Sequence, residues 1–291
     1  MKLDERYGEL EDSFMVVDGV KPALRVNTLK ISASELVKRL EAKGVKLEKV
    51  SFLDNGFFYT SDFSMGSTPE YLQGYYYLQE PASQLPVLVL DPKPGELVLD
   101  MAASPGGKTT QISSYMSGEG VIVALDNNSQ RLKSLNNNLE RLAVPNVLVY
   151  NLDARYADNL GLEFDKVLLD APCSGNFCVE RDFFNKRSVS DFKFKAEEQK
   201  KLLRAALKCL KKDGFLVYST CSLEPEEDEF VVNWLVENFD VEVEETGLSV
   251  GLPGSVNVFG NELSSSVGKT KKLWPHLTGT QGFFIARIRK C

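Results

Sequence analysis

The chain has 291 residues and a formal net charge of −7 at pH 7, and 43% of its residues are hydrophobic. This composition is typical of globular rather than disordered proteins, and the length allows one large domain plus a small one. The negative charge argues against non-specific adhesion to nucleic acid but is compatible with a local basic groove. No apolar run is long enough to cross a bilayer, and the first residues, MKLDER, contain no signal-peptide segment. We expect a cytoplasmic protein with no membrane partner.

The cysteines and the single histidine predict no metal centre. The chain has five cysteines, of which no two form a C-x-x-C pair, and one histidine, His276. The cysteines are Cys173, Cys178, Cys209, Cys221 and Cys291. Because their spacing fits neither a zinc site nor a disulfide framework, we expect no metal and free thiols.

Residues 1–75 are predicted to form a small α+β domain. The expected elements are a strand at 24–28, a helix at 32–42 and strands at 45–52 and 57–59. Ser32 or Ser34 would cap the helix, and Gly44 would end it. The domain is basic in Lys38, Arg39, Lys43, Lys46 and Lys49. For any single one of these charges, a solvated helix face is the simpler explanation.

Residues 76–291 are predicted to form an α/β domain with a doubly wound, mostly parallel sheet, because short apolar strands alternate with helices. The expected strands are 97–100, 121–125, 147–150, 167–170, 215–218, 241–243 and 283–288, and the expected helices are 108–116, 130–142, 196–210 and 226–239. Gly214 is expected to end the third helix after Lys211 and Lys212. Residues 247–272 are rich in Gly, Ser and Asn and are expected to form a long loop.

The stretch 97–112 predicts a nucleotide-type ligand. An apolar strand ends at Asp100, a glycine turn follows and a helix begins, and ligands lie over the carboxyl end of such a strand. The tripeptide Gly107-Lys108-Thr109 suggests an ATP phosphate loop. That motif, however, needs a glycine at Ala102, and Pro105 removes one of the backbone N–H groups that would bind phosphate.

The next apolar run narrows the choice of ligand. It ends at Asp126, where a ribose-binding carboxylate would fall, while the dinucleotide motif G-x-G-x-x-G is absent. An adenosyl cofactor without a diphosphate therefore fits best, and S-adenosylmethionine is the commonest. The alternative is an ordinary strand, turn and helix with no ligand.

Two cysteines follow neighbouring predicted strands. Cys173 comes directly after the strand that ends at Asp170, and Cys221 directly after the strand at 215–218. Because ligands bind beyond the carboxyl ends of parallel strands, both thiols should face the crevice that holds Asp126. Cys209, on an amphipathic helix, is better explained as a small buried apolar residue.

Two thiols and a carboxyl group at one sheet edge match the chemistry of methylation at carbon 5 of a pyrimidine. That carbon is too weakly nucleophilic to attack a methylsulfonium until a thiolate has added to carbon 6. A carboxyl group must stabilise the adduct by hydrogen bonding, and Asp170 is placed for this. A base must then remove the proton from carbon 5, so one thiol is the candidate nucleophile and the second is a candidate for this last step.

With these motifs, the chain resembles the Sun/Nop family of RNA 5-methylcytosine methyltransferases over nearly its whole length. The matching segments are 24–30 (LRVNTLK), 79–87, 97–110, 170–175 (DAPCSG), 219–227 (STCSLEPEE), 274–276 (WPH) and 282–286 (GFFIA). The combination of DAPCSG with STCSLEPEE is highly specific. The resemblance implies a Rossmann-like domain that uses S-adenosylmethionine.

The resemblance also implies residue roles: Cys221 is the nucleophile and Cys173 assists release. Analogy with DNA cytosine methyltransferases suggests the reverse, but only the RNA family explains both cysteines. Lys108 would lie near the target base. The implied cofactor-binding residues are Ala102, Ala103, Ser104, Pro105, Gly106, Gly107, Lys108, Asp126, Arg131, Asp153 and Asp170, and the implied substrate-binding residues are Arg25, Asn27 and His276. For Arg131, a solvated helix charge is the rival explanation.

We therefore expect a monomeric RNA cytosine-5 methyltransferase that acts on tRNA, with residues 1–75 helping to hold the RNA. The alternatives are rRNA as substrate, a DNA cytosine methyltransferase, and a non-catalytic RNA-binding factor. Two positions depart from the family pattern: Asn176-Phe177 follows DAPCSG where a glycine is common, and Gln281 stands where an acidic residue is usual. Residues 224–229 are expected to supply acids to the first turn of the following helix.

Overall fold

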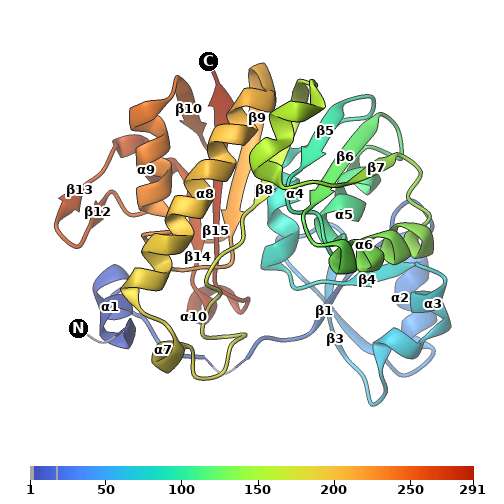
Figure 1. The fold of residues 1–291 in the computed structure, drawn as a ribbon. Helices are drawn as coiled ribbons and strands as arrows, with labels where there is room; N and C mark the ends of the chain where they lie inside the picture. The colour runs from blue at the N-terminus through green and yellow to red at the C-terminus, as the bar shows by residue number, and fades with distance from the viewer. Residues whose placement is uncertain (1–2, 18) are drawn as a thin grey trace.

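Two β-sheets organise the protein. The computed structural model describes residues 3–17 and 19–291, in which a nine-stranded sheet and a four-stranded sheet lie in separate units (Figure 1). The large sheet has the order β11-β14-β15-β9-β8-β5-β6-β7, and β10 also pairs with β15. Among the described residues, no helix combines the length and apolar character that a membrane span requires.

The large sheet is parallel at its centre and antiparallel at one side. Strands β9, β8, β5, β6 and β7 are parallel to one another, whereas β15 is antiparallel to β9, and β14 and β10 are antiparallel to β15. The strands are β5 (Leu97–Asp100), β6 (Val121–Asp126), β7 (Val147–Asn151), β8 (Phe164–Asp170), β9 (Leu210–Thr220), β10 (Val241–Glu244), β11 (Leu252–Pro253), β14 (Lys271–Leu273) and β15 (Phe283–Lys290). The chain order reverses between β5 and β8, and ligands bind at such a switch point. The predicted doubly wound, mostly parallel sheet is confirmed.

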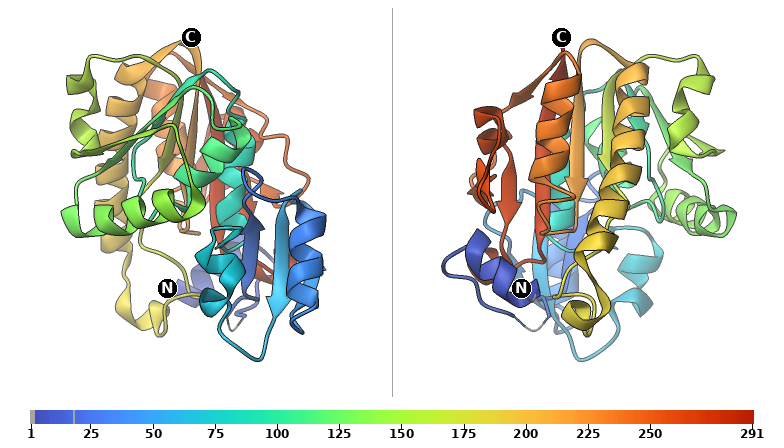
Figure 2. Two further views of the ribbon diagram at one scale, coloured as in Figure 1. Left: turned by 90° about the vertical axis from the view of Figure 1, so that its right-hand side faces the viewer. Right: turned by 60° about the vertical axis from the view of Figure 1, so that its left-hand side comes forward.

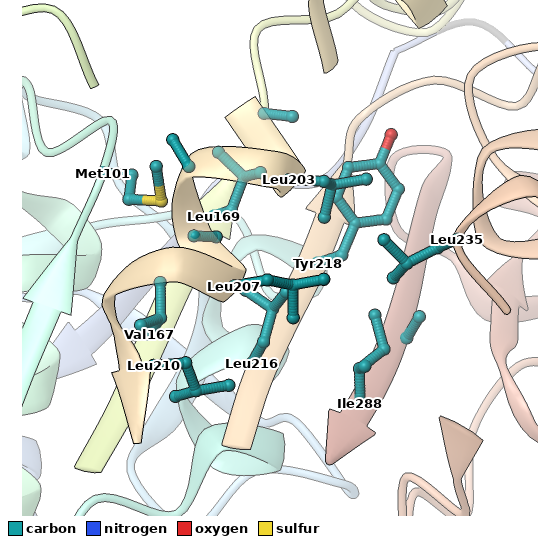
Figure 3. Packing of buried hydrophobic residues seen from close by; sticks show 14 of the residues in the cluster. Met101, Val167, Leu169, Leu203, Leu207, Leu210, Leu216, Tyr218, Leu235 and Ile288 are labelled. Atoms are coloured by element: carbon teal, nitrogen blue, oxygen red, sulfur yellow. The ribbon is translucent and has the colours of Figure 1, made fainter. Parts of the chain in front are cut away.

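Helices cover both faces of this sheet because successive strand residues point to opposite sides. Leu216 and Leu169 pack on the face covered by α8 (Val189–Cys209) and α9 (Glu229–Asn238), as Figure 3 shows. Val217 and Leu168 pack on the opposite face. That face is covered by α4 (Leu85–Leu90), α5 (Gly107–Tyr115) and α6 (Ser129–Leu142). The two helical layers therefore cover the faces of the sheet rather than the carboxyl ends of its parallel strands.

The small unit is an antiparallel sheet of order β2-β3-β1-β4 with its own apolar core. Its elements are β1 (Ala23–Val26), α2 (Ala33–Glu41), β2 (Lys46–Lys49), β3 (Gly56–Thr60), α3 (Pro69–Leu72) and β4 (Tyr76–Leu78). Ser32 caps α2, because its hydroxyl accepts a hydrogen bond from the backbone N–H of Glu35. The predicted small α+β domain is thus present, but its sheet includes β4 and so continues past residue 75.

The N-terminal helix α1 (Leu3–Leu10) belongs to the large unit, not to the small one. Leu3 and Tyr7 pack with Phe183, Phe192 and Trp274 from the large unit. Figure 2 shows α1 apart from the small sheet and close to α7 (Phe183–Lys186). The small unit therefore differs from the expected range 1–75 at both of its ends. It excludes α1, whose apolar partners lie far along the sequence, and it includes β4.

Two local expectations were wrong. Helix α8 ends at Cys209 and β9 begins at Leu210, so Gly214 lies inside a strand and does not end the helix. Residues 247–272 are not a featureless loop. They contain β11, β12 (Asn257–Val258), β13 (Asn261–Glu262), the 3₁₀ helix η4 (Ser265–Lys269) and the start of β14. Short edge pairings of this kind carry too few apolar residues to produce a periodic signal.

The remaining elements are short. They are α10 (Pro275–Thr278) and the 3₁₀ helices η1 (Met65–Ser67), η2 (Ala82–Gln84) and η3 (Ala154–Leu160). Strand β4 leads through η2 into α4, so the small unit is joined to the large one beside the carboxyl ends of the central strands.

Candidate active site

The turn after β5 is shaped by a glycine that no other residue can replace without strain. Gly106 has φ +105°, and a Cβ atom there would lie 2.9 Å from the Leu135 side chain on α6. Thr109, in the first turns of α5, donates a hydrogen bond from its hydroxyl to Asp100 Oδ2 over 2.7 Å. Burial raises the pKa of Asp100 to about 6. The strand end and the helix start are thereby held close together.

One pocket of about 300 Å³ opens over β5 and β6. It is lined by Met101, Ala102, Asp126, Asn127, Arg131, Asp153, Ala154, Arg155, Pro172, Lys195, Glu198 and Leu202. Asp126 is 5% exposed and accepts a hydrogen bond from the backbone N–H of Asn128 over 2.8 Å. Arg131 reaches from α6, with Nη1 3.7 Å from Asp126 Oδ2 and Nη2 donating to Ser104 O over 2.7 Å. The structure thus brings together Ala102, Asp126, Arg131 and Asp153, as predicted.

The residues of this pocket fit the ribose of an adenosyl cofactor. A ribose presents hydroxyl groups that a carboxylate such as Asp126 can accept, and the small side chain of Ala102 leaves space beside the strand end. Ser104 Oγ is buried and has no hydrogen-bond partner among the described residues. Such an unpaired buried hydroxyl is compatible with a ligand at the adjoining turn.

A second pocket of about 280 Å³ adjoins the first. Its lining residues are Tyr77, Leu78, Gln79, Glu80, Ser83, Ala102, Ala103, Ser104, Pro105, Gly107, Lys108 and Asp170. Lys108 Nζ lies 2.6 Å from Asp170 Oδ2, and the Ser219 hydroxyl donates to Asp170 Oδ1 over 2.7 Å. Lys108 and Asp170 therefore form an ion pair, and the Asp170 carboxylate is held from both sides.

Glu80 is a pocket residue that the sequence did not single out. It accepts hydrogen bonds from the backbone N–H groups of Gln281 (2.9 Å) and Ser83 (3.2 Å). Burial raises the pKa of Glu80 to about 7, although Lys108 opposes the shift. Glu80 lies in the matched segment 79–87, but a motif match assigns no role to an individual carboxyl group.

The two predicted thiols meet. Cys173 Sγ lies 2.8 Å from Cys221 Sγ, and both residues are free cysteines with partly exposed side chains. The hydrogen bond with Cys221 and burial raise the pKa of Cys173 well above its ordinary value, and the charge of Glu227 adds to the shift. Cys178, Cys209 and Cys291 are also free, and the first two are buried. Cys209 packs in the main core, as predicted for a buried apolar residue.

The loop after Cys173 is fixed to the loop that bears Cys221. Asn176 donates from Nδ2 to Cys221 O over 2.8 Å and to Gly282 O over 3.2 Å. Phe177, which stands at the position of a common family glycine, stacks on Phe184 with ring centroids 5.5 Å apart. The departure from the family pattern thus places an aromatic contact in this loop. It leaves the meeting of the thiols intact.

The acidic segment 224–229 supplies only Glu229 to the first turn of α9, so the expectation holds for that residue and not for the acids before it. Helix α9 begins at Glu229, and the carboxylates before it are buried. Arg6 of α1 pairs with Glu224 and Glu226, and Lys272 of β14 pairs with Asp228 and Glu229. A buried carboxylate needs such partners, and sequence position alone did not reveal that these partners come from distant elements.

The predicted substrate-binding residues Arg25 and Asn27 require correction. Arg25 is 3% exposed, and its guanidinium donates to Gly107 O (2.6 Å) and Thr110 Oγ1 (2.8 Å) on α5. The Asn27 amide donates to Gly74 O and Leu142 O. Both side chains tie the small unit to the large one, so neither presents a free polar group to RNA.

The contacts of His276 also differ from the predicted substrate-binding role. Its ring packs edge-on against Phe14, with ring centroids 6.0 Å apart, and near Trp274. Its Nε2 lies 3.2 Å from Ser13 Oγ. These contacts hold the segment that follows α1 against α10. Within the described residues, no group of three or more His, Cys, Asp or Glu side chains is arranged to hold a metal ion.

Comparison with known proteins gives two family matches. A family described as 16S rRNA methyltransferase RsmB/F matches residues 87–289, and the N-terminal domain of 16S rRNA methyltransferase RsmF matches residues 2–81. The chain is 39% identical to the tRNA (cytosine(49)-C(5))-methyltransferase of Pyrococcus abyssi over 99% of this chain and 96% of that protein. It is 37% identical to the 26S rRNA (cytosine-C(5))-methyltransferase nsun-1 of Caenorhabditis elegans. This chain spans 45% of the length of that worm protein and 35% of a mouse 28S rRNA (cytosine-C(5))-methyltransferase.

Solved structures agree with these matches. A methyltransferase homolog protein from Pyrococcus horikoshii superposes with a TM-score of 0.89 and 44% identity, covering 99% of this chain and 94% of that one. NSun6 from Pyrococcus horikoshii, solved with SFG, superposes with a TM-score of 0.86 and 28% identity, covering 99% and 97% of the two chains. Both similarities extend across the small and the large unit.

Proposed function

Because this chain belongs to the RsmB/F family of RNA methyltransferases, we propose that it methylates carbon 5 of a cytosine in RNA. The observation that carries the proposal is the meeting of Cys173 and Cys221, with sulfur atoms 2.8 Å apart, at the ends of two adjacent parallel strands. Asp170, at the end of the first of these strands, pairs with Lys108 of α5. A single thiol would serve nucleophilic attack, and a second beside it supplies the base that release requires.

The proposed mechanism begins with attack by the Cys221 thiolate on carbon 6 of the cytosine. The carbon 5–carbon 6 electron pair then makes carbon 5 nucleophilic, and Asp170, held by Lys108 and Ser219, hydrogen-bonds the edge of the base as charge develops. When bound, S-adenosylmethionine supplies the electrophilic methyl group. Cys173 next accepts the proton from carbon 5, and the bond between carbon 6 and Cys221 breaks to restore the double bond. Cys173 takes up this proton as a thiolate, and its raised pKa makes that thiolate a stronger base.

The residues assigned to the cofactor in this proposal are those of the first pocket and the adjoining turn. Asp126 would accept hydrogen bonds from the ribose hydroxyls, and Asp153 lies across the same pocket. Ala103, Pro105 and Gly107 line the second pocket, together with Lys108 and Asp170. Gly106 shapes the turn through its backbone.

Within this reaction we propose tRNA as the substrate. The support is the similarity to the tRNA (cytosine(49)-C(5))-methyltransferase of Pyrococcus abyssi, which extends over 96% of that protein. Ribosomal RNA is the second candidate, because other relatives carry rRNA methyltransferase names but are longer than this chain. The target base must be unstacked to admit attack above its plane, so an accessible cytosine in a structured RNA is required.

The test of the proposal is methyl transfer from labelled S-adenosylmethionine to matched nucleic acids. We expect label in a tRNA transcript and none in DNA of the same sequence, with bisulfite sequencing to locate the methylated cytosine. Label in an rRNA fragment but not in tRNA would change the substrate. Label in DNA alone would refute the proposed function. So would the absence of label in every RNA taken as substrate from cells that lack the gene.

The small unit is proposed to contact the RNA backbone through exposed lysines of α2 and β2. Lys38 and Lys46 are exposed, and β2 is an edge strand of the small sheet. Replacing both by alanine should weaken RNA binding and reduce the slope of log affinity against log salt by about 1–2, because each lysine neutralises about one phosphate. Cofactor affinity should not change. An unchanged salt dependence would assign the small unit a purely structural role.

A further inference from the structure

One buried carboxylate contacts both cysteine loops. Glu227 has no exposed surface and accepts hydrogen bonds from the backbone N–H and the hydroxyl of Ser174, the residue that follows Cys173. It also accepts a hydrogen bond from the hydroxyl of Ser222, the residue that follows Cys221, over 3.1 Å. The carboxylate is therefore linked to the immediate neighbour of each thiol.

The support for Glu227 comes from the helix and strand behind it. Gln199 on α8 donates from Nε2 to Glu227 Oε2 over 2.8 Å and to Pro172 O over 3.2 Å. The Tyr218 hydroxyl on β9 donates to Glu227 O over 2.5 Å. Burial raises the pKa of Glu227, while the hydrogen bonds from Ser174, Gln199 and Ser222 oppose the shift. A buried carboxylate with this many donors has one well-defined position.

We propose that Glu227 is a positioning residue that sets the distance and register between the Cys173 and Cys221 thiols. The loops that carry them leave two different strands, β8 and β9, and Glu227 joins them immediately beyond the sulfur atoms. Asn176 gives a second link, from the Cys173 loop to the Cys221 carbonyl. The inference rests on the proposed function, in which one thiol attacks the base and the other must reach carbon 5 of the same base.

This role differs from that of the neighbouring carboxylate. Glu226 is also buried, but among the described residues its side chain pairs with Arg6 of α1, with Nη2 2.8 Å from Oε2, and not with Ser174 or Ser222. Glu226→Gln is therefore a matched control for Glu227→Gln. The two substitutions make the same chemical change one residue apart.

The first measurement reports thiol spacing without RNA or cofactor. Phenylarsine oxide bridges two nearby thiols on one arsenic atom, and the two thiol protons leave with its oxygen as water. Peptide mass spectrometry should find Cys173 bridged to Cys221 in the wild type and in Glu226→Gln. In Glu227→Gln the bridging rate should fall about tenfold, and in Glu227→Ala further, because a displacement near 1 Å already costs reactivity steeply.

The second measurement is methyl transfer. Glu227→Gln should lower kcat by about 10²-fold while the KM for S-adenosylmethionine changes less than about twofold. A merely structural role would instead lower thermal stability and affect both constants. If Glu227→Ala does not fold, the double variant Ser174→Ala/Ser222→Ala removes the same hydroxyl donors and should show the same loss of bridging and kcat.

The result that overturns the proposal is equal bridging and equal kcat in folded Glu227→Gln and Glu226→Gln. Its failure is distinct from failure of the proposed function. If the wild type methylates no RNA, the reaction is wrong, and the bridging rates still decide whether Glu227 sets the thiol spacing.

Discussion

The pocket over β5 and β6, which we assign to the cofactor, and the thiol site of Cys173, Cys221 and Asp170 lie at the same edge of the sheet but are built differently. In the pocket over β5 and β6, Arg131 and Arg155 are 55% and 40% exposed in their side chains. In the thiol site over β8 and β9, Lys108 and Ser219 hold the Asp170 carboxylate. The Glu227 carboxylate behind the thiols is fully buried. The first region is open to a ligand that must enter and leave. The second is fixed by contacts that join several elements.

This difference teaches which measured quantity each region controls. An open pocket with a few polar groups contributes to ligand affinity. When one of these groups is removed, water partly replaces the lost hydrogen bond. A site held by many buried hydrogen bonds fixes the positions of the reacting groups, and a small displacement there reduces turnover steeply. Substitutions in the pocket over β5 and β6 should therefore change binding of the cofactor, and substitutions in the thiol site should change kcat.

The largest expected effect separates the two thiols. Cys221→Ala should abolish methylation and form no covalent species with RNA, because the nucleophile is missing. Cys173→Ala should still attack and methylate but stall before release, so a protein–RNA adduct should survive denaturing electrophoresis. An adduct with Cys221→Ala and none with Cys173→Ala would exchange the roles. Full turnover by both variants would end the proposed mechanism.

The next effect concerns the carboxylate at the base edge. Asp170→Asn should lower kcat by about 10²- to 10³-fold, the usual loss when a preorganised electrostatic contact is removed from a transition state. Asp165→Asn is the control, because Asp165 lies near the start of the same strand and contacts Leu97 N and Lys211 instead. Single-turnover kinetics measures both. A kcat for Asp170→Asn equal to that of the control would remove Asp170 from the chemistry.

A smaller effect is expected in the cofactor pocket. Asp126→Ala should weaken S-adenosylmethionine binding by about 1–3 kcal/mol, the contribution of hydrogen bonds to a charged group, with kcat at saturation nearly unchanged. Calorimetry on the isolated protein measures the affinity. Asp158→Ala, which removes an exposed partner of Lys208, serves as the control. Unchanged affinity in folded Asp126→Ala would exclude a ribose contact at this residue.

The smallest effect should come from Arg131. Its guanidinium is more than half exposed and lies 3.7 Å from Asp126 Oδ2, so Arg131→Gln should change cofactor affinity by less than about 1 kcal/mol. The same calorimetric titration, repeated at high salt, measures it. A loss as large as that of Asp126→Ala would mean that Arg131 contacts the cofactor directly, and the contrast between the two regions would weaken.

The parts that the sequence predicted share one physical cause. Central parallel strands are buried on both faces and appear as short apolar runs, so their ends are easy to locate. This is why Asp126, Asp170, Cys173 and Cys221 were assigned to one edge, where the structure has them. The resemblance to the Sun/Nop family is confirmed by the family matches.

The parts that the sequence did not predict depend on partners far apart in the chain. Arg25 appeared as a polar residue after an apolar run, and nothing nearby indicated that its acceptors lie on a helix more than 80 residues away. The interaction of Glu227 with Ser174 spans 53 positions in the same way. Periodicity reports how one element faces its surroundings, but it does not identify the partner of a buried polar group.

The pairing of β9 with β15 has a consequence for biosynthesis. Strand β9, which ends one residue before Cys221, is covered on one side by residues 283–290, which a ribosome makes long after residue 220. Until then β9 is an open edge bearing Leu216, Val217 and Tyr218, with unpaired N–H and C=O groups that invite association with other chains. A nascent chain stalled before residue 283 should therefore have no assembled thiol site and should recruit chaperones that bind extended apolar segments.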